Sequence, residues 1–181
     1  MAGTQSEETD WSGATQLSLG VIVGHLGADP SRRRWQALGV VAGQQFEAPR
    51  VERRLMRSGD DGDTFLWVGF RCRLHPAHTD DYAYNLQGET PGVYIVVSTH
   101  DDGFRPRQVT LSLDEAQNTD ATDLRSADET VLTVPMPPEV YRWVEHFVLD
   151  HHVPKKRKAR GKKRSRAMFD AEVGDSVEDT K

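Results

Sequence analysis

The 181-residue chain contains a single cysteine, Cys72, so no disulfide can form within it. It also lacks an apolar run of about 18 residues, and its first ten residues are polar and acidic, which argues against a membrane span and a secretory signal peptide. We therefore expect a cytoplasmic protein. Because hydrophobic residues make up only 36% of the chain, we expect one globular core with polar tails.

Lysine is missing from residues 1–154, so arginine alone supplies the basic charge of this part. Its 13 arginines stand against 23 acids, which gives a net charge of −10. Reactive motifs are missing as well. The sequence has no Gly-x-Ser-x-Gly elbow, no Cys-x-x-Cys, no His-Glu-x-x-His and no dinucleotide fingerprint, and the glycines of residues 20–27 lack the Lys-Ser/Thr ending of a phosphate loop. No stretch of the sequence therefore names a reaction, which favours a protein that is not an enzyme without deciding the question, and the sequence predicts no cofactor.

Residues 155–166 form the strongest charge feature, with nine Lys or Arg and no acid. The run contains no aromatic residue that could stack on bases, and charge alone supplies only salt-sensitive, non-specific binding to nucleic acid. We therefore favour contact with an acidic protein partner, with nucleic-acid binding and the absence of any specific contact as alternatives. The candidate partner-binding residues are Lys155, Lys156, Arg157, Lys158, Arg160, Lys162, Lys163, Arg164 and Arg166.

Alternating apolar residues predict short strands over residues 17–25, 35–42, 51–56, 65–74, 82–86, 93–99, 109–113 and 130–134. A capping box at Ser112 and Glu115 predicts one short helix. In the strand over 65–74, the alternation places one set of side chains inward, among them Cys72, whose burial would keep the thiol unreactive. The inward set is Leu66, Val68, Phe70, Cys72 and Leu74.

A helical repeat over residues 138–152 collects apolar side chains on one face. Its members are Val140, Trp143, Val144, Phe147 and Val148. The fold class that follows is α+β, mainly an antiparallel sheet of about seven short strands capped by this C-terminal amphipathic helix. We expect a disordered acidic tail over residues 1–15, a single domain over 16–153, and a disordered basic and then acidic tail over 154–181.

Two groups of residues could carry chemistry. If the strand over 82–86 pairs with that over 93–99, imidazoles and carboxylates converge at one hairpin end, and these are ligand types for a divalent transition metal. Solvated strand ends explain the same pattern. This metal hypothesis names His75, His78, Asp80, Asp81, His100, Asp101 and Asp102.

The second group is His151 and His152 at the end of the predicted helix. The helical repeat places His151 on the inward face and His152 at its edge. Histidines in a last turn cap the terminal carbonyls and interact favourably with the helix dipole, which explains the pair without further function. A ligand or proton-transfer role is the alternative.

Several stretches together resemble an uncharacterised family of small bacterial proteins encoded beside the genes for molybdenum-dependent formate dehydrogenase. The most specific is Val-Pro-Met-Pro at 134–137, which leads to Trp-Val-x-x-Phe-Val-x-x-His-His at 143–152. The resemblance covers about residues 17–153 and excludes the tails. Other matching residues are Leu74, His75, Thr79, Tyr82, Asn85, Leu86, Pro91, Val93, Tyr94, Val96, Val97, Ser112, Glu115, Ala116 and Val140.

The resemblance implies an accessory role in assembling formate dehydrogenase, by binding an enzyme subunit or its cofactor. It implies no catalytic residues. The alternatives are a small metal- or cofactor-handling enzyme that uses the His/Asp group, and a nucleic-acid-associated protein that acts through the basic tail.

Overall fold

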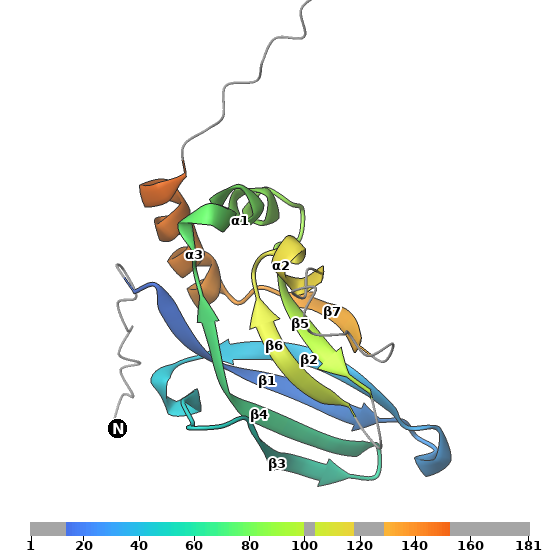
Figure 1. The fold of residues 1–181 in the computed structure, drawn as a ribbon. Helices are drawn as coiled ribbons and strands as arrows, with labels where there is room; N and C mark the ends of the chain where they lie inside the picture. Colours follow the sequence, from blue (N-terminus) through green and yellow to red (C-terminus); the bar gives the residue numbers. More distant parts are fainter. Residues whose placement is uncertain (1–13, 100–103, 118–128, 153–181) are drawn as a thin grey trace, which may run out of the picture.

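The computed structural model describes residues 14–99, 104–117 and 129–152. In these ranges it contains seven strands and three α-helices, which confirms the predicted α+β class (Figure 1). The strands are β1 (Gln16–Leu26), β2 (Arg34–Ala42), β3 (Glu52–Gly59), β4 (Gly62–Arg73), β5 (Gly92–Ser98), β6 (Arg105–Thr110) and β7 (Glu129–Pro135). The helices are α1 (Thr79–Leu86), α2 (Leu113–Gln117) and α3 (Pro138–His151), with short 3-10 turns η1 (Pro30–Arg32), η2 (Gln44–Phe46) and η3 (Pro76–His78).

The strands form two antiparallel sheets, one in the order β2-β1-β4-β3 and one in the order β6-β5-β7. One hydrophobic core draws side chains from both sheets, with Leu19 and Val21 of β1 and Ile95 of β5 fully buried. Strand β2 lies next to β7, and β4 lies next to β6. The sheets therefore pack as a sandwich, and α1 and α3 lie together at one end of it (Figure 1).

A bulge at Gly69 divides β4 and corrects part of the predicted alternation. Val21 of β1 lies opposite Trp67, whereas Leu19 lies opposite Phe70, so β4 contains one residue more than β1 between these pairs. The extra residue reverses the alternation, and Trp67 is buried instead of Leu66. Gly69 has φ +93, and a Cβ there would lie 2.5 Å from the Arg50 carbonyl oxygen, so the bulge requires glycine.

The strand predicted over residues 82–86 is wrong, because this segment is the second half of α1. Tyr82 and Tyr84 suggested a period of two, but Tyr84 is exposed. The inward side chains instead follow helical spacing and come from Thr79, Tyr82, Ala83 and Leu86. Asp80 and Asp81 occupy the first turn, where carboxylates interact favourably with the helix dipole.

Asn85 fixes α1 to the second sheet. Its buried side-chain amide donates to the carbonyl oxygens of Gly92 (2.8 Å) and Leu111 (2.9 Å), and its Oδ1 accepts from the Gly92 N–H (2.9 Å). Tyr82, one turn earlier, accepts a hydrogen bond from the His75 N–H (3.2 Å) through its hydroxyl. These bonds hold α1 at a defined position on the sandwich.

Helix α3 confirms the predicted apolar face, because Val140, Trp143, Val144 and Phe147 are buried. The Trp143 indole also donates to the Ala14 carbonyl oxygen (2.6 Å). The expectation that His151 faces inward is wrong. His151 is exposed in the last turn of the helix, where its ring stacks on that of Phe147.

The predicted capping box is confirmed at the start of α2, where the Ser112 hydroxyl oxygen accepts from the Glu115 N–H (3.0 Å). The Glu115 carboxylate does not complete the box. It accepts instead from the Thr110 hydroxyl and the Gln108 amide on β6. Glu115 therefore joins α2 to β6.

Candidate functional site

The histidine and aspartate candidates that the structure describes gather around the start of α1. His75 Nδ1 accepts from the Ala77 N–H (3.2 Å), so it caps η3. His78 Nδ1 lies 3.4 Å from Asp81 Oδ2, and that same oxygen accepts from the Ser112 hydroxyl (2.8 Å). Each of these side chains thus has a local structural partner.

The end of α3 joins this group, because His152 Nε2 lies 3.1 Å from Asp80 Oδ1. His151 Nδ1 lies 2.9 Å from the Phe147 carbonyl oxygen, and the two rings stack at 4.2 Å. The structure therefore brings together two groups that the sequence analysis treated separately. The contact of His151 with a last-turn carbonyl is the capping contact that the sequence predicted.

In residues 14–99, 104–117 and 129–152, no three His, Cys, Asp or Glu side chains are close enough to hold a metal ion. His100, Asp101 and Asp102 lie outside the described residues, so the seven-residue metal site stays a hypothesis. Metal analysis of tag-free protein after exposure to zinc, manganese and nickel tests it, and protein without bound metal would reject it. The nine basic residues of 155–166 also lie outside the described part of the chain.

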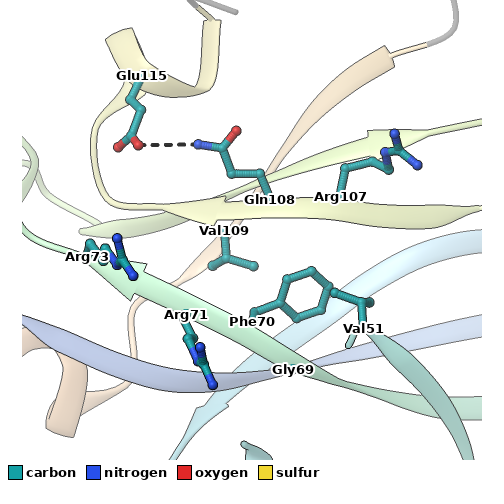
Figure 2. Close-up of a pocket in the computed structure, with 9 residues that line it drawn as sticks. All are labelled: Val51, Gly69, Phe70, Arg71, Arg73, Arg107, Gln108, Val109 and Glu115. Carbon is teal, nitrogen blue, oxygen red and sulfur yellow. Dashed lines mark hydrogen bonds between the residues drawn. The ribbon is translucent and has the colours of Figure 1, made fainter. Parts of the chain in front are cut away.

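A second candidate site is a hollow of about 250 Å³ between β4 and β6, where the two sheets meet (Figure 2). Arginines of both sheets line it, with Arg71 and Arg73 on β4 and Arg107 on β6, and Figure 2 shows the guanidinium groups of Arg71 and Arg107 pointing away from each other. Apolar side chains of both strands lie between them. The lining residues are Val51, Gly69, Phe70, Arg71, Arg73, Arg107, Gln108, Val109 and Glu115.

The three arginines of the hollow differ in their partners. Arg71 donates to the Glu47 carboxylate (2.8 Å), and Arg73 donates through Nε to Gln16 Oε1 (2.9 Å). Arg107 makes no hydrogen bond or ion pair with any residue that the structure describes. Glu115 is the one acid in the lining, and Thr110 and Gln108 already donate to it. The hollow is therefore a positively charged site in an acidic protein.

Sequence reasoning missed this hollow. The alternation over residues 65–74 correctly directs Arg71 and Arg73 outward, but Arg107 lies on a strand of the other sheet. By themselves, Arg71 and Arg73 are a solvated pair on one strand, and they share a hollow with Arg107 because β6 lies next to β4. The bulge at Gly69, which the sequence did not reveal, also forms part of the lining.

Strand β3 presents a different surface at the edge of the first sheet. It pairs with β4 on one side, and no other described strand pairs with it. Leu55 and Met56 are 61% and 55% exposed. Residues 50–59 contain four arginines and one acid, Glu52. An exposed strand edge of this kind can bind an extended polypeptide segment.

Cys72 is not a reactive group at neutral pH. It is buried in the core, and burial, with a smaller contribution from the charge of Glu115, raises the pKa of its thiol to about 12. Because the thiolate is the nucleophilic form, this buried thiol is a poor nucleophile near neutral pH.

The profile of the family described as "Protein of unknown function (DUF3305)" matches residues 22–164. No curated protein and no solved structure matches the chain. Among the helices of the described residues, none has the length and apolar character needed to cross a membrane, since α3 has 14 residues.

Proposed function

The chain belongs to the DUF3305 family, and from that premise we propose that it is a non-enzymatic accessory protein that binds a subunit of a molybdenum-dependent formate dehydrogenase during assembly. Formate dehydrogenase is proposed as the partner because residues 134–137 and 143–152 resemble the family encoded beside its genes. The choice of protein binding comes from one observation, the exposed edge of β3, which pairs with no further strand of the described residues.

Strand β3 suits an extended segment of the partner subunit. Such a segment would add as a further strand and form main-chain hydrogen bonds with the edge that β4 leaves unpaired. Leu55 and Met56 would lose exposed apolar surface on binding, which favours association. The arginines of residues 50–59 favour an acidic segment, because opposite charges speed encounter and exclude basic competitors.

The residues that carry the family resemblance have structural roles, which supports a binding function over catalysis. Asn85 joins α1 to the second sheet, Tyr82 receives the His75 N–H, and Trp143 holds Ala14. Each is buried. These buried residues stabilise the domain that carries β3, so binding of a partner would fall to exposed residues.

The test is capture of the formate dehydrogenase subunits by purified chain variants. Leu55→Glu with Met56→Glu adds negative charge to β3, and we expect it to abolish capture by an acidic segment. Leu149→Glu is the matched control, because Leu149 is 77% exposed on α3, at the other end of the sandwich (Figure 1). Circular dichroism would confirm that all variants are folded. Equal capture by the β3 variant and wild type would reject β3 as the binding edge.

Gene deletion tests the role in assembly. We expect the deletion strain to lose formate dehydrogenase activity and the cofactor content of its subunits, and unchanged activity would reject the proposal. Rescue by a chain that ends at Val153 would exclude the basic tail, and with it the nucleic-acid alternative. If the protein is instead an enzyme that uses the His/Asp group, the His78→Ala or Asp80→Asn variant should fail to restore formate dehydrogenase activity in the deletion strain.

A further inference from the structure

We propose that Arg53 on β3 recognises a carboxylate of the bound segment, so that β3 selects segments in which Asp or Glu stands two positions from an apolar residue. Arg53 would act at the edge described above, so its role rests on the proposed function. Two features support this role, the uncovered face of β3 and the different partners of its three arginines.

One face of β3 extends beyond the second sheet. The first sheet has four strands and the second has three, and the outer strands of the second sheet, β6 and β7, lie next to β4 and β2. Strand β3 therefore lies past the edge of the second sheet (Figure 1). Arg53 pairs with the core residue Trp67, and Leu55 pairs with Phe65, which packs against the core. Because directly paired residues share a face, both β3 side chains lie on the inner face, where both are exposed.

Aromatic rings of β4 hold the guanidinium group of Arg53. Its Cζ lies over the ring of Phe65, 4.8 Å from the centroid, and over the ring of Trp67, 5.8 Å from the centroid. A cation over an aromatic face is attracted by the negative potential of that face. The side chain has therefore already lost part of the rotamer freedom that a binding event would otherwise have to remove.

Arg53 differs from the other two arginines of β3 in its partners. Arg54 donates to the Glu52 carboxylate, and Arg57 donates to the Asp61 carboxylate (2.9 Å). Arg53 makes no hydrogen bond or ion pair with any residue that the structure describes. A guanidinium group has five N–H donors, and two parallel donors match the two oxygens of a carboxylate. Arg53 therefore offers a positioned cation with free donors, whereas the other two would have to leave an existing pair.

The spacing of Arg53 and Leu55 defines the sequence that the edge would select. A strand added to β3 would place the residue opposite Arg53 on the same face, with the two Cβ atoms about 5 Å apart. An Asp or Glu at that position would pair with the guanidinium group. The residue two positions along would lie opposite Leu55, which is 61% exposed, so an apolar side chain there would bury apolar surface.

The test is a double-mutant cycle with the full chain and two labelled peptides, measured by fluorescence anisotropy at about 0.15 M salt. The first peptide, Thr-Val-Thr-Glu-Thr-Val-Thr, places one acid between two apolar residues on one face in either strand direction. The second has Gln in place of Glu. We expect wild type to bind the Glu peptide about tenfold more tightly than the Gln peptide, because a charge-assisted hydrogen bond is present only with the acid. Arg53→Gln should bind the two peptides about equally.

Arg54→Gln is the matched control. Arg54 is the next residue of the strand, points to the opposite face and is already paired with Glu52, so its loss should keep the preference for the Glu peptide. Circular dichroism would confirm that the variants are folded. Equal affinity of wild type for both peptides, or an equal loss of preference with Arg54→Gln, would overturn the role of Arg53 and leave β3 as a binding edge. Binding of neither peptide, or binding that survives Leu55→Glu/Met56→Glu, would overturn the edge itself and the role of Arg53 with it.

Discussion

Replacement of Asn85 by alanine should strongly destabilise the domain. The Asn85 side chain is 8% exposed and makes three hydrogen bonds, to Gly92 O, Gly92 N–H and Leu111 O. Alanine removes all three bonds and leaves these backbone groups without their side-chain partner inside the domain.

The expected loss follows from those bonds. A hydrogen bond contributes about 1 kcal/mol net, and a buried polar group left without a partner costs about 1–3 kcal/mol. Three lost bonds therefore predict a decrease of about 3 kcal/mol or more in the free energy of unfolding. Since domains of this kind have a total of about 5–15 kcal/mol, the variant would retain only part of its stability.

Urea denaturation followed by circular dichroism measures this loss, with the m-value as a check that both proteins unfold in the same way. Asn85→Asp has nearly the same size and keeps the acceptor for Gly92 N–H, but it places an oxygen against two carbonyl oxygens, so it should be at least as unstable as alanine. Gln87→Ala, an exposed change just after the same helix, should stay within about 0.5 kcal/mol of wild type. An Asn85→Ala variant within that same margin, at an unchanged m-value, would refute the reasoning.

Three further outcomes can be measured by the same unfolding experiment. Gly69→Ala should cost about 1–3 kcal/mol, because it forces φ +93 on a residue with a Cβ, whereas Gly39→Ala, which has open space and no positive φ, should not destabilise. Trp143→Ala should cost about 3–5 kcal/mol, and an unchanged stability would show that α3 does not close the core. The buried Cys72 thiol has its pKa raised from 9.0 to about 12, so the unfolded thiol ionises first and stability should fall as the pH rises from about 9 towards 12. Cys72→Ala should flatten this slope, and the same slope in both proteins would contradict the assignment to Cys72.

Local sequence patterns predicted the strands and helices whose periodicity can be read within the segment itself, without knowing what packs against it. The inward residues of β1 alternate without interruption up to His25, and α3 repeats Val140, Val144 and Phe147 at helical spacing, so both were found at nearly their observed limits. Helix α1 was missed because Tyr82 and Tyr84 repeat at a period of two. The helical spacing of Thr79, Tyr82, Ala83 and Leu86 was a readable signal for it.

The sites depend on contacts that local patterns do not contain. Arg107 reaches the hollow because β6 lies next to β4, although the two strands belong to different sheets. The shift at Gly69 depends on the register between β1 and β4, which only the assembled sheet defines. His152 and Asp80 meet across 72 positions of sequence. Each of these features follows from topology rather than from residue spacing.

The hydrogen bond from Trp143 to Ala14 spans 129 positions, and this separation affects how the protein folds during its synthesis. A ribosome releases β1 first and α3 only after the rest of the domain. During that interval the apolar face that Trp143, Val144 and Phe147 will cover remains open to water and to other nascent chains. Folding of the complete domain must therefore follow synthesis of α3, and a chain interrupted before Pro138 should be a substrate for chaperones and proteases rather than a smaller stable protein.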